Sequence, residues 1–197
     1  MGRGGCALAG LGLLALFSAV PARAAQVYRL DQRFGTIDFS VSNLGLFQAH
    51  GDFGQFVGVL RIDPTAPDAT RIAVTVAAGS VHSGWAQETT MLRSAEFFDV
   101  ARYPDIRFHS RQVRTEGIGH YLIRGDLTLR GRTRPVTLHA RLVHEARTQA
   151  GQQIDDFVVT GAVSRRSFGM IADPLFISDT VRLTIRARVI LADTSGG

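Results

Sequence analysis

Residues 120–130 read HYLIRGDLTLR, and apolar and polar side chains alternate along most of the stretch. Tyr121, Ile123, Leu127 and Leu129 occupy one set of alternate positions, and charged or hydroxyl-bearing residues occupy most of the other. Because successive side chains of a strand point to opposite faces, this period of two is typical of a strand with one face buried and the other in water. The stretch therefore predicts an antiparallel sheet with one apolar face.

The same alternation recurs on both sides of this stretch. It is found at residues 36–41, 71–78, 136–145, 157–163 and 181–191, and further candidates lie at 27–30, 51–62 and 105–113. Together these segments make about nine strand candidates at the spacing of an antiparallel barrel or sandwich. Most connections between them are short, which favours an up-and-down order, and closure of such a sheet removes its exposed edges. A single all-β domain closed into a barrel is expected.

Two connections are longer, and both are apolar. Residues 83–104 contain a helix-like stretch whose apolar face we expect to comprise Met91, Leu92, Ala95, Phe97 and Phe98. Residues 165–179 form a loop that carries Phe168, Met170, Ile171, Leu175, Phe176 and Ile177. A loop this apolar is not expected to lie in water, so both segments are predicted to cover part of the barrel.

The first 25 residues have the features of a cleaved leader. Arg3 precedes an apolar run at residues 7–20, and Ala22-Arg23-Ala24 is a small-x-small cleavage pattern, so cleavage is expected before Ala25 or Gln26. The apolar run is shorter than the ~20 residues of a membrane-spanning helix. The sequence thus predicts a signal peptide at 1–25, a barrel domain at 26–193, and a periplasmic or secreted location.

Composition narrows the chemistry of the mature domain. Its one cysteine, Cys6, leaves with the leader, so a disulfide, a thiol nucleophile and a thiolate metal site are not expected. The formal charge of +5 falls to +3 when Arg3 and Arg23 leave, and the remaining arginines are spread along the chain. No nucleic-acid partner is therefore expected. The spacing of the histidines does not favour a metal site, and no cofactor is predicted.

Several strings resemble the YceI-like family, a lipocalin-like, polyisoprenoid-binding group. The strongest is LRSAEFFDV at 92–100, followed by Tyr103-Pro104 and by IRF at 106–108. Similar blocks are Tyr28-Arg29-Leu30-Asp31 with IDFSV at 37–41, GDLTL at 125–129 with PVTL at 135–138, and Phe168-Gly169 with ISD at 177–179. These blocks follow one another in order along the whole mature chain.

The resemblance implies an antiparallel eight-stranded lipocalin-like barrel around a long apolar cavity that holds a polyisoprenoid lipid or a quinone. It also shows departures from the family. Asn43, Met91 and Arg130 stand where members often carry histidine, and Glu88-Thr89 replaces an Arg-Asp pair. The polar recognition of a head group is therefore expected to differ from that of other members.

The ligand site is predicted from the apolar residues, each of which is equally suited to an ordinary core. Burying each CH₂ contributes ~0.8 kcal/mol, so a chain of several isoprene units binds without a dedicated polar cluster. Arg165-Arg166 lies where a strand ends, and an arginine fork there is suited to a diphosphate or a quinone oxygen. The residues predicted to line the cavity or its plugs are Phe39, Val41, Leu46, Phe56, Phe97, Phe98, Ile106, Phe108, Leu127, Leu129, Arg165, Phe168 and Phe176.

Two other functions remain open at this point. One is an enzyme that acts on an isoprenoid or a small ester through His109 or Arg165-Arg166. The sequence also contains the residue types of a hydrolase, in Ser94, His109 and Asp99, but it has no Gly-x-Ser-x-Gly elbow. The other is a partner-binding module that uses the apolar loop at 168–177. A membrane-surface contact through Arg130, Arg132 and Arg134, and a homodimer, are also left open.

Overall fold

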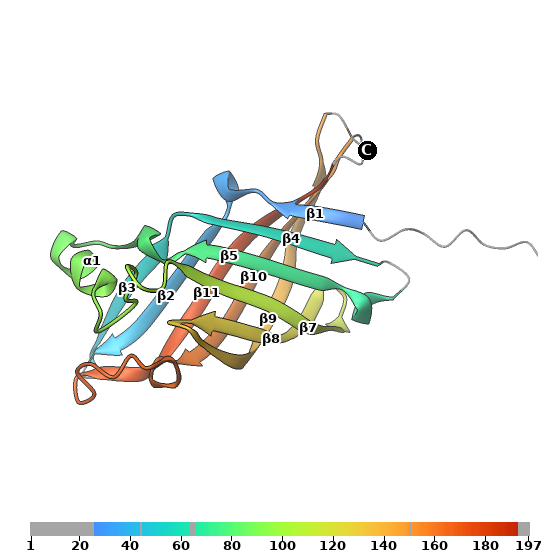
Figure 1. Cartoon of the computed structure of the whole chain (residues 1–197). Helices are drawn as coiled ribbons and strands as arrows, with labels where there is room; N and C mark the ends of the chain where they lie inside the picture. The colour runs from blue at the N-terminus through green and yellow to red at the C-terminus, as the bar shows by residue number, and fades with distance from the viewer. Residues whose placement is uncertain (1–25, 44, 64–65, 150, 193–197) are drawn as a thin grey trace, which may run out of the picture.

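The protein is one closed β-barrel with a small helix at one end (Figure 1). A computed structural model describes residues 26–43, 45–63, 66–149 and 151–192, so the predicted leader lies outside the described residues. Eleven strands form one sheet in the order β1-β4-β5-β7-β8-β9-β10-β11-β2-β3-β6, and β1 also pairs with β11. The strands are β1 (Gln26–Leu30), β2 (Thr36–Asn43), β3 (Phe47–Phe53), β4 (Phe56–Ile62), β5 (Arg71–Ala77), β6 (Val81–Ser83), β7 (Asp105–Gly117), β8 (His120–Leu129), β9 (Arg132–Arg147), β10 (Gln153–Ser164) and β11 (Ile177–Leu191).

The pairing of β1 with β11 closes a ring of eight positions, which confirms the eight-stranded antiparallel barrel. Three of these positions are each filled by two consecutive strands. β1 and β2 are separated by the 3-10 turn η1 (Gln32–Phe34), β3 and β4 by Gly54-Gln55, and β5 and β6 by the turn η3 (Ala78–Ser80). The segment at 51–62, predicted as one strand, is therefore two strands with a bend between them.

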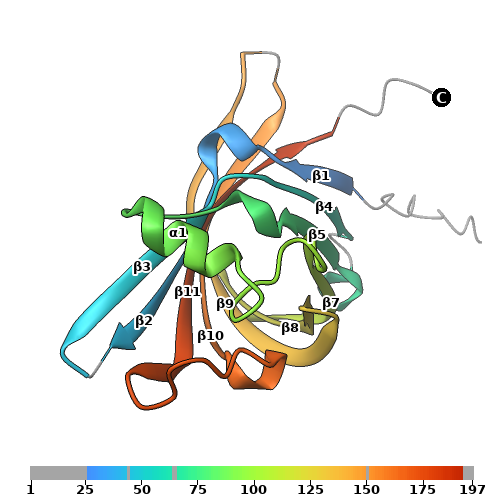
Figure 2. The ribbon, with the colours of Figure 1, turned by 60° about the vertical axis from the view of Figure 1, so that its left-hand side comes forward.

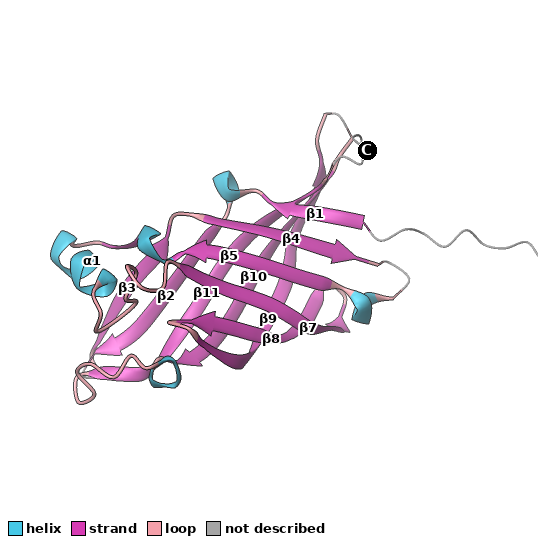
Figure 3. Cartoon of the chain, viewed as in Figure 1, coloured by secondary structure: helices cyan, strands magenta, loops and turns pink. Residues whose placement is uncertain are grey.

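The turns between β7 and β8 and between β8 and β9 are tight, as the sequence predicts. Between β8 and β9 the loop is Arg130-Gly131, and both residues have positive φ. Two positive φ values are the requirement of a type I′ hairpin turn, whose twist matches that of the flanking strands. Tight turns of this kind keep consecutive strands adjacent, and Figure 3 shows the strands side by side around the barrel. Inward and outward residues then alternate in phase from one strand to the next.

One end of the barrel is covered by α1 (Ala86–Arg93) and by the irregular segment that follows it (Figures 1 and 2). The helix ends at Arg93, so the predicted extension of its apolar face to Phe97 and Phe98 is wrong. These two side chains are still buried, because the chain after the helix turns back toward the barrel. The buried hydroxyl of Thr89 holds the helix in place by accepting a hydrogen bond from the backbone of Ser83 (3.0 Å).

The closing loop, residues 165–176, passes from β10 to β11 at the same end (Figure 2). Its first part is buried through Phe168 and Met170, whereas Leu175 and Phe176 are exposed. The expectation that the whole loop is withdrawn from water is therefore wrong for its second part. Arg130 ties the loop to the helix segment, because its guanidinium donates to the carbonyl oxygens of Gly169 (3.1 Å) and Ala95 (2.8 Å).

The described residues contain no helix of the length and apolar character needed to cross a bilayer.

Candidate functional site

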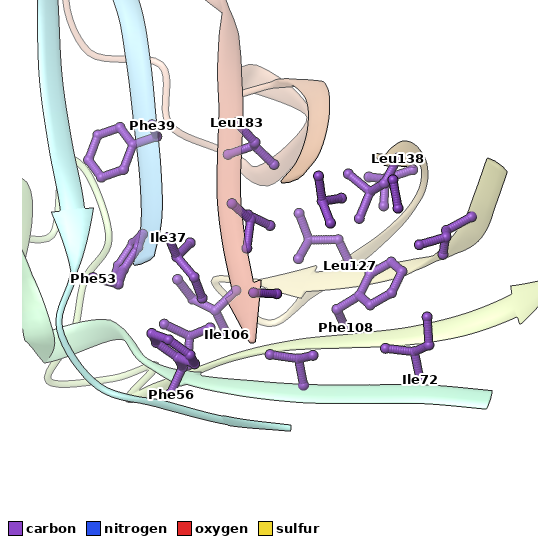
Figure 4. A pocket seen from close by; sticks show the side chains of 18 of the residues that line it. Ile37, Phe39, Phe53, Phe56, Ile72, Ile106, Phe108, Leu127, Leu138 and Leu183 are labelled. Carbon is purple, nitrogen blue, oxygen red and sulfur yellow. The ribbon is translucent and has the colours of Figure 1, made fainter. Parts of the chain in front are cut away.

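The inward faces of the strands enclose a cavity of about 720 Å³. This lies within the range of about 300–1,000 Å³ that is usual for small-molecule sites. The cavity extends from Asn43 and Met91, beside the helix, to Gln153 and Asp155 at the opposite end of the barrel. Its wall is built almost wholly from aliphatic and aromatic side chains, several of which point into the same space in Figure 4.

Most of the residues predicted to line the cavity do so. Leu46 and Phe176 lie outside it, because both are exposed at loop tips, and Phe168 is buried in the neighbouring core instead. That the lining residues contact a ligand stays a prediction. The lining includes Phe39, Val41, Phe56, Phe97, Phe98, Ile106, Phe108, Leu127, Leu129 and Arg165.

Sequence reasoning missed other parts of the wall. Ile37, Val74, Leu138 and Leu183 also line the cavity. Each of the four lies two residues from another inward-facing position of its own strand. The alternation with period two therefore predicts that all four side chains point inward.

Two glycines let phenylalanine rings lie flat against the wall. A Cβ at Gly51 would overlap the ring of Phe39, and a Cβ at Gly125 would lie 2.6 Å from the ring of Phe108 and 2.5 Å from the backbone oxygen of His109. No side chain other than the hydrogen of glycine fits beneath these rings. The rings therefore cover the wall instead of crossing the cavity, which keeps its centre open.

Three phenylalanines narrow the cavity at the helix end. Phe98, from the segment after α1, packs edge-on against Phe53 (5.3 Å between ring centroids) and Phe39 (6.0 Å). Edge-to-face pairs of this kind contribute about 0.5–1.5 kcal/mol beyond burial of their area. The cluster joins the covering segment to β2 and β3, so the cover is packed onto the barrel rather than lying loosely over it.

The polar side chains that line the cavity at this end include Asn43, Glu88 of α1 and Arg165. Asn43 lines it, and in the described part of the chain its Oδ1 is a buried side-chain oxygen without a hydrogen-bond partner. A buried acceptor left in this state costs about 1–3 kcal/mol. A hydroxyl or amine brought by a ligand would satisfy it.

Arg165 also lines the cavity, but its guanidinium is already engaged. It is 3% exposed and donates to the backbone oxygens of Met170 (2.9 Å), Ile177 (2.9 Å) and Ser178 (3.0 Å). Burial lowers the pKa of Arg165, and the neighbouring charge of Arg166 lowers it further. The geometry makes Arg165 a positioning residue that holds both ends of the closing loop together.

Adjacent carboxyls at the other end of the barrel have opposite environments. Asp155 faces the cavity, where burial raises its pKa although Gln153 donates to it. Asp156 lies on the other face of β10 and accepts two bonds from Arg188 (2.7 and 2.8 Å), and this pairing lowers its pKa. The two residues therefore respond to pH in opposite senses.

Ser94 and Asp99, two of the hydrolase residue types, are neighbours, because the backbone N–H of Asp99 donates to the carbonyl oxygen of Ser94 (2.8 Å). His109 is exposed on β7, and no side-chain hydrogen bond joins it to Ser94 or Asp99 in the described residues. The same part of the chain holds no group of three metal-ligating side chains placed around a common point.

The sequence pattern of the YceI-like domain matches residues 28–189, which is nearly the whole barrel. The chain belongs to the YceI-like family. This YceI-like chain is 35% identical over 173 residues to a UPF0312 protein of Pseudomonas putida, covering 87% of this chain and 89% of the relative. It is 32% identical over 180 residues to Protein YceI of Salmonella arizonae, covering 90% and 94%.

Three solved structures have the same fold. BcnA of Burkholderia cenocepacia superposes with a TM-score of 0.72 at 18% identity, over 81% of this chain and 98% of that one. A polyisoprenoid binding domain from Saccharophagus degradans gives a TM-score of 0.62 at 15% identity, over 85% and 99%. The YceI protein of Campylobacter jejuni gives 0.65 at 23%, over 73% and 85%. The resemblance noted in the sequence is thereby confirmed.

Proposed function

We propose that this protein holds the chain of a polyisoprenoid lipid or isoprenoid quinone in its cavity, outside the cytoplasm, without covalent chemistry. The observation that carries the proposal is the apolar cavity that runs along the barrel. Membership of the YceI-like family and the polyisoprenoid binding domain among its structural neighbours support it.

The volume of the cavity is sufficient for a chain of about four isoprene units. A volume of 720 Å³ equals about 24 water molecules of about 30 Å³ each, and a chain carbon with its hydrogens is of similar size, so about 20 carbons fit. At about 0.8 kcal/mol for each buried carbon, such a chain contributes about 16 kcal/mol. Association costs about 4–15 kcal/mol, so roughly four isoprene units offset it without strong polar contacts.

The polar lining favours an uncharged head that carries a hydroxyl. Asn43 offers a buried acceptor, and a prenol, phenol or quinol hydroxyl is a donor of the right kind. Arg165, predicted as part of an anion-binding fork, has its donors directed at backbone oxygens. A diphosphate would therefore find little compensation for its charge at this position.

The predicted leader supports a periplasmic or secreted location for this binding protein. An isoprenoid chain needs such a carrier there, because it is nearly insoluble in water between membranes.

The direct test is native mass spectrometry of protein purified from its own host, with extraction and identification of any bound lipid. Leu183→Trp fills the cavity from β11, whereas Arg182→Trp adds the same side chain on the exposed face of that strand. We expect a polyprenyl mass on the unsubstituted protein and on Arg182→Trp, and its loss from Leu183→Trp. Repeated recovery of empty protein that also fails to take up a polyprenol from detergent micelles would refute the proposal.

A further inference from the structure

Five large apolar side chains are exposed at one end of the barrel. Leu46 and Phe47 lie at the turn between β2 and β3, and Ile171, Leu175 and Phe176 lie in the closing loop. Leu46 is 81% exposed and Leu175 is 85% exposed. Each such side chain would gain about 1.5–3 kcal/mol from burial. We call these five residues the apolar rim.

The two segments of the rim are neighbours in space. Asn43, just before the turn, pairs with Ile177, just after the closing loop, in the ladder between β2 and β11. A shallow surface hollow is lined jointly by Ser42 and Gly45 from the turn and by residues 174–179 from the loop. Figures 1 and 2 both show the turn and the loop at the end of the barrel that carries α1. The rim is thus one surface rather than two separate tips.

This surface is continuous with an end of the cavity. Asn43 and Ile177 line the cavity and adjoin the rim in the chain. Met91 of α1 lines the cavity too and is 39% exposed, so a side chain of the cavity wall is also part of the protein surface at this end. Apolar side chains therefore extend from the interior to the exposed rim.

The charges around the rim fit an anionic lipid surface. Residues 42–49 contain no charged side chain. The acidic residues at this end are Asp173 of the closing loop, Asp179 beside the hollow, and Glu88 and Glu96 of the covering segment. Arg132, Arg134 and Arg166 are exposed at the same end, and the guanidinium of Arg132 lies against Gly169 of the loop. Arginine near an anionic bilayer contributes about 1 kcal/mol. Apolar tips flanked by basic side chains are the usual composition of a peripheral membrane contact.

We propose that the apolar rim inserts into the surface of an anionic bilayer and places this end of the cavity against the membrane. Bilayer contact itself is independent of what the cavity holds; the exchange of lipid through this end rests on the proposed function. A protein partner and a second copy of the chain are the other occupants that the test must separate.

The test is flotation of the protein without the predicted leader at 1–25, whose own apolar run would bind membranes, with vesicles of phosphatidylglycerol and phosphatidylethanolamine. The combined variant Leu46→Ser, Phe47→Ser, Leu175→Ser and Phe176→Ser removes most of the rim, and Ile118→Ser is the matched control. Ile118 is 101% exposed at the turn between β7 and β8. We expect the rim variant to bind vesicles at least tenfold more weakly and the control to bind as the unsubstituted protein does.

A depth measurement provides an independent readout. The chain has one tryptophan, Trp85, so Trp85→Phe with Phe47→Trp leaves the sole indole in the rim, and Trp85→Phe with Ile118→Trp leaves it at the control position. Brominated lipids should quench the fluorescence of the first protein and not that of the second. Equal quenching, or no vesicle binding by the unsubstituted protein, overturns the proposal.

The remaining outcomes are equally decisive. If the rim substitutions convert a dimer into a monomer in analytical ultracentrifugation and leave vesicle binding unchanged, the rim is an interface between copies and the proposal fails. If the unsubstituted protein loads a polyprenol from micelles but never associates with vesicles, the proposed function stands and the rim proposal fails. If it floats with vesicles through the rim but loads no lipid from either source, the rim proposal stands and the proposed function fails.

Discussion

Replacing Arg165 by methionine should loosen the closing loop and lower the stability of the whole barrel. Methionine keeps the apolar stem but removes the donors that serve the carbonyl oxygens of Met170, Ile177 and Ser178. A buried acceptor that loses its donor costs about 1–3 kcal/mol. Since Ile177 and Ser178 are only partly buried and admit some water, we expect a total loss of about 3–5 kcal/mol.

The assay is urea unfolding followed by circular dichroism, with Arg166→Met as the control. Arg166 is exposed, and its side chain makes one long bond to the carbonyl of Pro174 (3.4 Å), so its loss should cost less than about 0.5 kcal/mol. In thermal unfolding the Arg165 variant should lose about 10 °C, at about 2–4 °C for each kcal/mol in a domain of this size. A loss within about 1 kcal/mol of the control would show that Arg165 does not hold the loop.

Three further substitutions test the two carboxyls of β10 and the cavity wall. Burial raises the pKa of Asp155, so the folded state loses stability as pH rises through that pKa. Asp155→Asn should therefore be more stable than the unsubstituted protein at neutral pH and should lose this advantage in acid. Urea unfolding measured at a series of pH values tests this. Pairing with Arg188 lowers the pKa of Asp156. Its contribution to folding stability is therefore present above the pKa of the unfolded state and is lost as pH falls through the pKa of the folded state. Asp156→Asn should cost about 1–2 kcal/mol of stability at neutral pH and nothing in strong acid. A matching pH profile for the two variants would contradict both assignments. Gly125→Val should push the ring of Phe108 into the cavity, which should lower polyprenol loading severalfold and cost about 1–3 kcal/mol of stability. The control is Gly79→Ala, where a Cβ meets nothing within 4 Å, and it should change neither loading nor stability. A Gly125 variant that still loads fully would mean that the wall adapts to the new side chain.

The alternation of side chains was enough to predict the barrel and most of the cavity wall. Phe108, Leu127 and Leu129 were placed correctly because a strand of fixed period leaves each side chain a choice between two faces. The break at η1 was predicted, since 27–30 and 36–41 were separate strand candidates, but the bend at Gly54-Gln55 was not, because a bend changes the direction of a strand and not its pattern.

Loop residues follow no fixed period, so the sequence pattern could not predict which of them are buried. Phe168 and Phe176 belong to the same apolar loop, yet one is buried and the other exposed. The difference depends on Arg165, whose hydrogen bonds to residues five to thirteen positions ahead fold the first part of the loop inward. Leu46 was assigned to the cavity from its apolar character alone, but the turn between β2 and β3 carries it beyond the end of the barrel.

Closure of the ring depends on the two ends of the described chain. Tyr28 of β1 pairs with Leu191 of β11, so the contact that completes the barrel joins residues separated by almost the entire domain. Long-range pairings of this kind form late in folding, because the intervening chain must first be ordered. Until β11 has been synthesised, β1 and β10 each present an unpaired edge that invites association with other chains. Loss of the final strand through a premature stop codon would therefore yield an open, aggregation-prone sheet rather than a smaller barrel.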